Sequence, residues 1–241
     1  MIKLYQFPIS HYCEKIRWAL DYKSIQYEKI NLLPGLHIKK TKKLAKYSSV
    51  PVLVDGDKVI QNSAEIISYL DAKYDQKCLT PDDESERKQA LEWEEYLDKE
   101  LGPHVRCVCY HILLDHPGVV IPFFTHQGPW YGKLFLKFGF KKLQSKMRHF
   151  MKINEKTAKE SLIKMEIAIK KINEQLKQTK FLSGDKFSRA DLTAASLLAP
   201  LCQPAGYGLE WPENTPKELL AISNKLKKEI EWVDEVYKQY R

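Results

Sequence analysis

The sequence predicts an α/β domain over residues 1–76 followed by an all-helical domain over residues 83–241. Before the boundary, short apolar runs alternate with helical patterns, whereas after it no strand-like alternation of any length occurs. The chain of 241 residues can bury a substantial core. It divides more naturally into a smaller and a larger domain than it forms a single one.

Apolar spacing sets the element order of the first domain as β-α-β-α-β-β-α. In chain order the elements are a strand near Ile2–Gln6, a helix near Tyr12–Tyr22, a strand near Gln26–Asn31, a lysine-rich segment, a strand after Pro51, a strand at Lys58–Ile60 and a helix at Asn62–Tyr74. The pair Asp55-Gly56 is typical of a tight turn and separates the last two strands.

A polar segment near residues 74–82 marks the domain boundary. Thr80 is a cap residue, Pro81 suits a first helical turn, and acids follow, so we expect a long helix to start here. The helical patterns of the second domain cover residues 84–113, parts of 131–151, 157–178, 188–198 and 217–240.

Within the second domain, the run from Phe181 to Asp191 is the strongest local signal. Ser188 and Asp191 have capping-box spacing, and Phe187 and Leu192 stand where a hydrophobic staple would close the entry turn. Taken alone, this pattern predicts a well-started, buried helix and no catalytic role.

The formal net charge of +8 comes mainly from lysine, with clusters over residues 39–46 and 133–152. The ordinary explanation of these lysine clusters is a solvated helix or loop face, and the more specific explanation is a site that binds an anionic partner. We expect no nucleic-acid partner, because no recognised binding motif occurs and the first cluster is almost purely lysine.

Apolar stretches such as residues 118–124 are shorter than the roughly 18 residues of a spanning helix, and the N-terminus lacks a signal peptide's apolar core. We therefore expect a cytoplasmic protein without stable membrane insertion. The cysteines are odd in number and scattered, which favours reduced thiols: Cys13, Cys78, Cys107, Cys109 and Cys202. We expect no metal at Cys107 and Cys109, because that spacing turns their side chains about 200° apart on a helix.

The most informative motif joins the first strand to the first helix with the residues Pro8-Ile9-Ser10-His11-Tyr12-Cys13. A strand-to-helix turn presents backbone N–H groups and the positive end of a helix, so a sulfur or oxygen placed there is stabilised as an anion. Ser10 stands at that turn.

With this turn, the chain resembles the glutathione S-transferase superfamily, in particular its serine-type branch. Three further motifs follow in the expected order: Val50-Pro51, Asp55-Gly56 and Asn62-Ser63. The run around Ser188 and Asp191 looks like the helix start of the family's C-terminal domain. The resemblance implies an N-terminal thioredoxin-like domain that binds glutathione and an all-helical domain that carries the acceptor site.

The resemblance implies that Ser10 stabilises the glutathione thiolate, which then attacks a small hydrophobic electrophile. A free thiol, with a pKa of about 8.5, is mostly protonated at neutral pH, and only the thiolate attacks well. The alternative for Ser10 is an ordinary helix cap. In tyrosine-type relatives, the hydroxyl that stabilises the thiolate belongs to a tyrosine at the position where this chain has Gln6. Tyr12 is a possible second donor.

For glutathione itself, the resemblance implies a backbone contact at Val50, with a cis bond to Pro51. Asn62 and Ser63 would hold the γ-glutamyl group, although Asn62 is shorter than the residue of many relatives. His37 and Lys40 are candidates for the glycyl carboxylate, in the region between the second and third strands.

The acceptor pocket is expected between the first turn and the helical domain, with Tyr12, Tyr110 and Trp130 among its walls. The apolar segment over residues 116–132 is either buried or holds a hydrophobic ligand. The resemblance also implies a homodimer.

Two alternatives remain at this point. Cysteine-type relatives that reduce disulfides place their nucleophile where Ser10 stands, and Cys13 occupies the second position of such a pair. A glutathione-dependent thiol reductase or peroxidase is therefore one alternative. The other is a non-catalytic binding module with the transferase fold.

Overall fold

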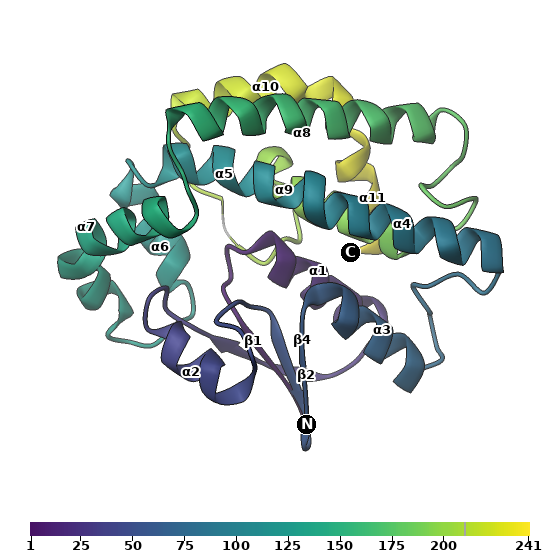
Figure 1. The fold of residues 1–241 in the computed structure, drawn as a ribbon, viewed down its shortest axis with the longest axis horizontal. Coiled ribbons are helices and arrows are strands. Elements are labelled where there is room, and N and C mark those ends of the chain that lie inside the picture. The colour runs from purple at the N-terminus through teal and green to yellow at the C-terminus, as the bar shows by residue number, and fades with distance from the viewer. Residues whose placement is uncertain (210) are drawn as a thin grey trace.

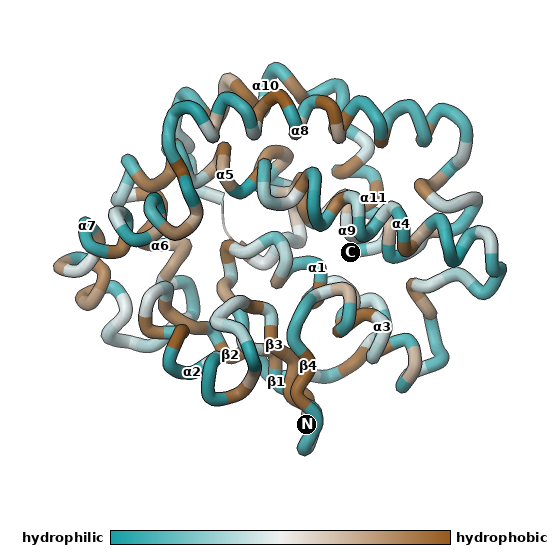
Figure 2. Tube along the Cα trace, in the orientation of Figure 1, coloured by the Kyte–Doolittle hydropathy of each residue, from teal (hydrophilic) through white to brown (hydrophobic). Residues whose placement is uncertain are grey.

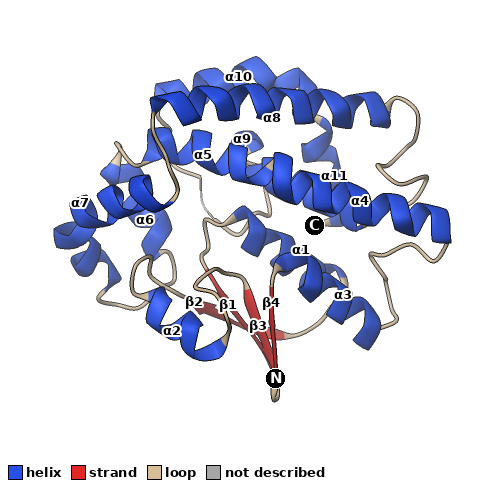
Figure 3. Cartoon of the chain, viewed as in Figure 1, coloured by secondary structure: helices blue, strands red, loops and turns tan. Residues whose placement is uncertain are grey.

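The computed structural model of the chain describes residues 1–209 and 211–241. A four-stranded sheet lies at one side of the molecule and a layer of long helices at the other, with α1 (His11–Tyr22) between them (Figures 1 and 3). The other elements of the first domain are β1 (Ile2–Gln6), β2 (Tyr27–Asn31), α2 (His37–Leu44), β3 (Val52–Asp55), β4 (Lys58–Gln61) and α3 (Ser63–Lys73).

The sheet has the strand order β2-β1-β3-β4, with β1 and β2 parallel and the other neighbouring pairs antiparallel. The predicted element order is confirmed, and the lysine-rich segment forms α2. The turn between β3 and β4 contains Gly56 at φ +60°, a left-handed conformation that glycine adopts without strain. This mixed sheet with its helices is the thioredoxin-like arrangement that the resemblance implies.

The second domain is helical throughout its described residues. Its helices are α4 (Glu84–Glu100), α5 (Gly102–Leu113), α6 (Pro117–Thr125), α7 (Gly132–Phe150), α8 (Glu155–Leu176), α9 (Arg189–Cys202), α10 (Lys217–Ile230) and α11 (Trp232–Tyr240). The fold class predicted from the sequence is therefore confirmed.

Several helix boundaries differ from the prediction. Residues 84–113 form two helices, because Pro103 in the first turn of α5 has no N–H for the preceding helix to bind. The cap of α4 is Asp83, which accepts from the Glu86 N–H, while the Thr80 hydroxyl donates to Asp71 instead. Residues 217–240 are also divided, at Glu231.

The segment between α5 and α7 is not an extended loop, since its residues 117–125 form α6. Pro117 stands in the first turn of this helix, where a missing N–H costs nothing. Phe123 and Phe124 are buried, so the apolar character of the segment is explained by packing against the core.

Helix α9 is the centre of the molecule, with all of its residues buried except Pro200 and Cys202. It packs against α1, α4, α5, α10 and α11. Four alanines let these neighbours approach closely: Ala190, Ala194, Ala195 and Ala199. The buried apolar residues of both domains form one continuous core cluster, and α1 packs against α3 of its own domain and against α9 of the helical domain.

The C-terminal end of the chain is fastened onto α1. The Arg241 guanidinium donates to Glu14 at 2.8 Å and to Asp21 at 2.7 Å. The indole N–H of Trp18, whose side chain is completely buried, donates to the Tyr240 carbonyl at 2.8 Å. These contacts tie the first helix of the chain to its last one.

The predicted capping box at the start of α9 is confirmed. The buried Asp191 carboxylate accepts from the backbone N–H groups of Leu182 and Ser188, at 2.8 and 3.0 Å, and from the Ser188 hydroxyl at 2.9 Å. It therefore closes the turn that precedes α9 and starts the helix at the same time.

We expect Asp191→Ala to lower the free energy of unfolding by about 2–4 kcal/mol, because it leaves several buried donors without an acceptor. The matched control is Asp83→Ala, which removes the exposed cap of α4 and should cost about 1 kcal/mol. Urea denaturation followed by circular dichroism measures both. Equal losses for the two variants would contradict this role of Asp191.

Candidate functional site

The strand register brings the predicted glutathione contacts to one end of the sheet. Tyr5 of β1 lies opposite Val52 of β3, which lies opposite Gln61 of β4. The C-terminal ends of β1 and β4 and the N-terminal end of β3 therefore lie at the same end of the sheet. Pro51 directly precedes β3, Asn62 directly follows β4, and Ser10 follows β1 by four residues.

Ser10 is the N-cap of α1. Its backbone N–H donates to the Phe7 carbonyl at 3.0 Å, and its side-chain oxygen accepts from the Cys13 N–H at 3.3 Å. The half-buried hydroxyl acts as an acceptor in this cap, and the described residues offer its hydrogen no acceptor stronger than the Cys13 thiol, whose sulfur is a weak one. The geometry thus combines the capping role with a donor that is still available.

Cys13 lies one turn further along α1 and is completely buried. Burial raises the pKa of its thiol, with Ser10 and Arg17 only partly opposing the effect. All five cysteines are free thiols, so Cys13 has no disulfide partner. This environment favours a packed, inert thiol over a redox-active one.

The expected cis bond between Val50 and Pro51 is present. Val50 precedes β3, and its backbone N–H and C=O make no hydrogen bond to the described residues. An unpaired N–H and C=O at a sheet end can bind an extended peptide in the manner of an added strand. Val50 is thus a suitable backbone contact for the cysteinyl part of glutathione.

Asn62 and Ser63 start α3 in different ways. Asn62 is the N-cap, with φ at +88°, and its side-chain oxygen accepts from the Ala64 N–H at 2.9 Å. Ser63 is buried, and its hydroxyl makes no hydrogen bond to the described residues. Its hydroxyl and the helix N-terminus suit a carboxylate. The Asn62 side chain is engaged with its own helix, which weakens it as an amine ligand.

Gln61 is a positioning residue that the sequence argument missed. Its side-chain amide donates to the carbonyls of Tyr47 and Ser49, at 2.9 and 2.8 Å, and accepts from the Tyr47 N–H at 3.0 Å. These bonds fasten the loop that leads to Val50. A hollow of about 380 Å³ lies beside this clamp and reaches Asn62.

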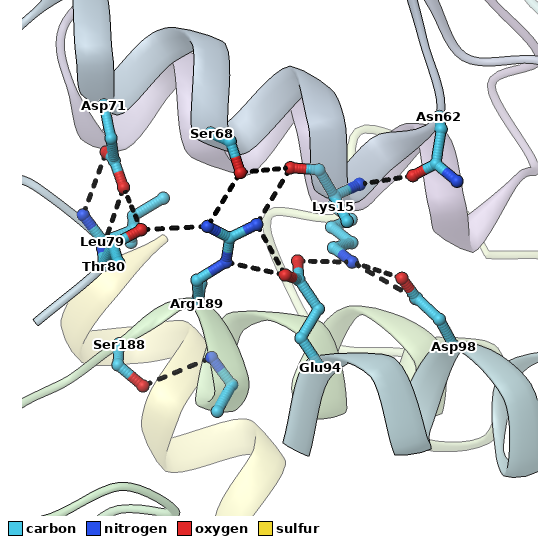
Figure 4. A network of polar contacts seen from close by, with 12 residues as sticks. Lys15, Asn62, Ser68, Asp71, Leu79, Thr80, Glu94, Asp98, Ser188 and Arg189 are labelled. Carbon is cyan, nitrogen blue, oxygen red and sulfur yellow. Dashed lines mark hydrogen bonds and ion pairs between the residues drawn. The ribbon is translucent and has the colours of Figure 1, made fainter. Parts of the chain in front are cut away.

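A second positioning device is the buried polar network of Figure 4. The Arg189 guanidinium donates to Glu94 at 2.6 Å, to the Ser68 and Thr80 hydroxyls, and to the Ala64 carbonyl at 2.9 Å. The Glu94 carboxylate also pairs with Lys15 at 2.8 Å, and Lys15 pairs with Asp98 at 2.9 Å.

This network connects the two helices that start at the site. Ala64 and Ser68 belong to the first turns of α3, and Lys15 lies one turn beyond the Ser10 cap of α1. Both helices are therefore held against α4 and α9 of the second domain. No single sequence motif predicts the network, because its members come from four helices and the segment before α4.

His37 and Lys40 lie on α2, next to the same sheet end. The Nδ1 atom of His37 accepts from the Gly35 N–H at 3.0 Å, and its ring packs edge-on against Phe7. Burial lowers the pKa of His37 to about 4, so it is a neutral donor through Nε2 at physiological pH. Lys40 is exposed and lies over the Tyr5 ring.

Gln6 stands at the position of the tyrosine in tyrosine-type relatives, but here it has a structural role. It is buried, donates to the Asn31 side chain at 2.9 Å and accepts from Arg17 at 2.7 Å. Tyr5 lies on the opposite face of the strand, as the alternation of strand side chains predicts. The described residues thus offer Ser10 as the hydroxyl that faces the turn.

On the acceptor side, Tyr12 and Tyr110 lie near the first turn of α1. The Tyr12 hydroxyl donates to the Asp98 carbonyl at 2.8 Å, so its hydrogen is engaged and it is not a second donor for a thiolate. Burial raises the pKa of Tyr110 above its usual value, and its ring lies 6.0 Å from that of Phe124.

Of the three predicted acceptor-pocket residues, Trp130 is the most exposed. Its exposed fraction is 91%, and its ring lies 5.7 Å from that of the neighbouring Tyr131. It stands in the segment between α6 and α7, and its place in an acceptor pocket stays a prediction.

Two residues near the first turn were also missed from the sequence. The Nε2 atom of the buried His11 has no partner among the described residues, and burial together with Arg106 lowers the pKa of His11 to about 3. Arg106 stands one turn after Gly102, whose position against the Tyr12 hydroxyl leaves no room for a side chain. Arg106 therefore lies on the face of α5 that covers the first turn of α1.

The described residues contain no group of three or more His, Cys, Asp or Glu side chains arranged to hold a metal ion. Within the same residues, no helix combines the length and apolar character needed to cross a membrane.

With this geometry in place, the chain can be compared with known families. Residues 4–78 match the family model of the glutathione S-transferase N-terminal domain, and residues 135–217 match that of its C-terminal domain. The two matches follow in chain order, separated by residues 79–134, and together they cover 158 of the 241 residues. The protein therefore belongs to the glutathione S-transferase superfamily.

Several curated plant proteins are similar to this chain. Glutathione S-transferase Z2 of Arabidopsis thaliana is 36% identical over 117 residues, which are 47% of this chain and 52% of that protein. Glutathione S-transferase Z1 of the same plant is 44% identical over 85 residues, 34% of this chain and 38% of the relative. These alignments thus span about half or less of each relative. A probable glutathione S-transferase of Nicotiana tabacum is 26% identical over 97% of this chain and 82% of its own length.

Solved structures agree in fold. Glutathione transferase F7 from Populus trichocarpa superposes with a TM-score of 0.68 at 15% identity, covering 99% of this chain and 94% of that one. The β-etherase LigF from Sphingobium sp. strain SYK-6 gives 0.65 at 19% identity, covering 97% and 98%. At such identities these likenesses show the fold alone.

We expect Gln61→Ala to weaken glutathione binding by about fivefold to tenfold, because the loop before Val50 would then be ordered only on binding, at a cost of about 1 kcal/mol or slightly more. Isothermal titration calorimetry measures the Kd. The matched control is Gln26→Ala, an exposed glutamine at the opposite end of the sheet. A Kd that shifts equally in both variants, or in neither, would contradict the clamp.

Proposed function

We propose that the protein is a serine-type glutathione transferase, which conjugates the glutathione thiolate to small hydrophobic electrophiles. The observation that carries the proposal is the state of Ser10. Its oxygen caps α1 while the described residues offer its hydrogen only the weakly accepting Cys13 thiol, at the end of the sheet where the predicted glutathione contacts meet. The family to which the chain belongs uses glutathione as its substrate, so a thiol is the expected acceptor of this hydrogen bond.

Three electrostatic contributions favour the thiolate at this position. The Ser10 hydroxyl donates to the sulfur, the N-terminus of α1 provides partial positive charge, and Arg106 on α5 adds a full positive charge nearby. Together they suffice to lower the thiol pKa by about two units, which requires roughly 2.7 kcal/mol of preference for the anion. Glutathione is then the nucleophile, and the protein forms no covalent intermediate with it.

Glutathione would bind as an extended peptide at the end of the sheet where β1 and β4 end and β3 begins. Val50 pairs through its backbone with the cysteinyl part, with Pro51 fixing the turn. The Ser63 hydroxyl and the N–H groups at the start of α3 hold the γ-glutamyl carboxylate. His37 and Lys40 are the candidates for the glycyl carboxylate, His37 as a neutral donor and Lys40 as a cation.

The electrophile would approach from the side of the helical domain, past Tyr12 and Tyr110. Both side chains present mainly apolar ring surface there, since the hydroxyl of Tyr12 is engaged with Asp98. This composition supports an apolar acceptor. We also propose a homodimer, as is typical of the family, and a cytoplasmic location.

A glutathione-dependent thiol reductase or peroxidase remains the second candidate. It requires a reactive cysteine, and Cys13 is the one next to the site. Its complete burial and raised pKa favour the transferase instead. A non-catalytic binding module is the third candidate, and glutathione binding itself tests it.

Replacement of Ser10 separates its capping role from its donor role. In Ser10→Ala we expect the pKa of bound glutathione, titrated by thiolate absorbance in the ultraviolet, to rise by about one unit toward the free value of about 8.5, because the N-terminus of α1 and Arg106 remain. Ser10→Asp keeps a strong N-cap but has no hydrogen to donate, so its folding should be preserved while the pKa rises further than in the alanine variant, because the added carboxylate repels the thiolate. Ser10→Thr keeps both functions and should retain the low pKa. Saturable binding with an unshifted wild-type pKa would refute the role of Ser10.

Cys13→Ala decides between conjugation and thiol reduction. We expect the rate of conjugation to a hydrophobic test electrophile to stay within about twofold, because a buried thiol contributes packing and no chemistry. Disulfide reduction by the wild type that disappears in Cys13→Ala but survives in Ser10→Ala would establish the reductase instead.

A further inference from the structure

Helix α7 and the residues before it expose an apolar stripe. The inner face of the helix is buried through Gly132, Leu136 and Phe140, which recur every four residues. The opposite face carries Leu134 and Phe138, with exposed fractions of 59 and 80%, and Trp130, which is 91% exposed, stands in the turn just before the helix. Because Leu134 and Phe138 are offset by two residues from the buried set, they point in the opposite direction, away from the protein.

Lysines run along the same outer surface. Three exposed lysines have the same four-residue spacing: Lys133, Lys137 and Lys141. Lys133 and Lys137 directly precede Leu134 and Phe138 in the sequence. Helix α7 contains five lysines and one arginine and no acidic residue. Its lysines make no ion pair within the described part of the chain, whereas its arginine pairs with Asp115. Brown and teal segments accordingly alternate along α7 in Figure 2.

We propose that this face of α7 binds the surface of an anionic phospholipid bilayer. An amphipathic helix with aromatic and leucine side chains on its outer face and lysines beside them is suited to lie in the plane of the membrane interface. The apolar stripe would enter the boundary between headgroups and acyl chains, and the lysines would contact the lipid phosphates. The binding is peripheral, and it does not depend on the proposed transferase activity.

Charge complementarity selects this occupant over the others. A second copy of the chain seated on the same face would bring one uncompensated lysine row against another, which disfavours self-association. A nucleic acid would also neutralise the lysines, but it binds exposed side chains by stacking bases on aromatic rings, and Leu134 offers no such ring. An anionic lipid surface matches both the charge and the aliphatic character of the stripe.

Helix α7 is held to the rest of the molecule, so the whole protein would dock with it. The Leu33 side chain packs against Gly132, and Gly35 approaches the Leu143 side chain, so the loop before α2 lies along α7. Figure 1 shows α2 on the same side of the molecule as α6 and α7. The lysines of α2, such as Lys39 and Lys42, are exposed as well, and α2 adds positive charge on this side of the molecule.

The test is flotation of the full-length protein with vesicles of phosphatidylcholine alone or mixed with phosphatidylserine. We expect the wild type to float with the mixed vesicles, more weakly at high salt, and much less with phosphatidylcholine alone. In the triple variant Lys133→Glu, Lys137→Glu, Lys141→Glu, the affinity should fall by at least about a hundredfold, since each lysine near an anionic surface contributes about fivefold. The charge-matched control Lys217→Glu, Lys227→Glu, Lys228→Glu lies on α10 and should bind like the wild type.

Two further variants test the apolar stripe. Leu134→Ser with Phe138→Ser should abolish flotation, whereas Ile163→Ser with Ile167→Ser, an equally exposed pair on α8, should not. Brominated phosphatidylcholine included in the mixed vesicles should quench tryptophan fluorescence, and Trp130→Phe should remove most of the quenching, because Trp18 and Trp93 are buried and Trp211 and Trp232 are half-buried. Circular dichroism and glutathione binding verify that each variant is folded.

Other outcomes would overturn the proposal. Absence of flotation with the mixed vesicles would refute it, as would equal losses in the α7 and α10 lysine variants. Binding of a single-stranded oligonucleotide that depends on the same lysines, without any binding to vesicles, would identify the face as a nucleic-acid site. A mass in analytical ultracentrifugation that falls only in the stripe variants would identify it as a contact between copies of the chain.

Discussion

The buried guanidinium of Arg189 is the interaction on which the arrangement of the site depends. It stands in the first turn of α9 and binds groups from α3, α4 and the segment that connects the domains. Lys15 of α1 joins the same network through Glu94. Two cations and two carboxylates, those of Glu94 and Asp98, balance one another in the protein interior. Breaking such a set by removing one member leaves a charge unpaired, at a cost of about 3–5 kcal/mol.

This network gives the capping box of α9 a second consequence. By fixing the first turn of α9, Ser188 and Asp191 also fix the direction in which Arg189 leaves the helix. The start of α3 then depends on a folding motif that lies far away in the sequence. The two domains thus form one structural unit around the candidate site, in agreement with their continuous apolar core.

The site and the outer face of α7 differ in whether their charged side chains are buried and paired. Near Ser10 the charged side chains are buried and paired, and they hold the helix starts in place. On α7 the lysines are exposed and unpaired within the described residues, beside apolar side chains that the protein itself does not cover. The first arrangement suits a preorganised pocket for a small anionic peptide, and the second suits an extended anionic surface.

The fold class, the strand-to-helix turn with Ser10, the turn at Gly56 and the capping box at Ser188 could be predicted from the sequence, because each depends on residues close together in the chain. Which side chains are available depends instead on the tertiary structure. It engaged the Tyr12 hydroxyl with Asp98, buried Cys13, exposed Trp130 and made Gln61 a clamp. These outcomes depend on contacts between segments up to more than a hundred residues apart, such as Arg189 with Ala64, and local spacing contains no information about them.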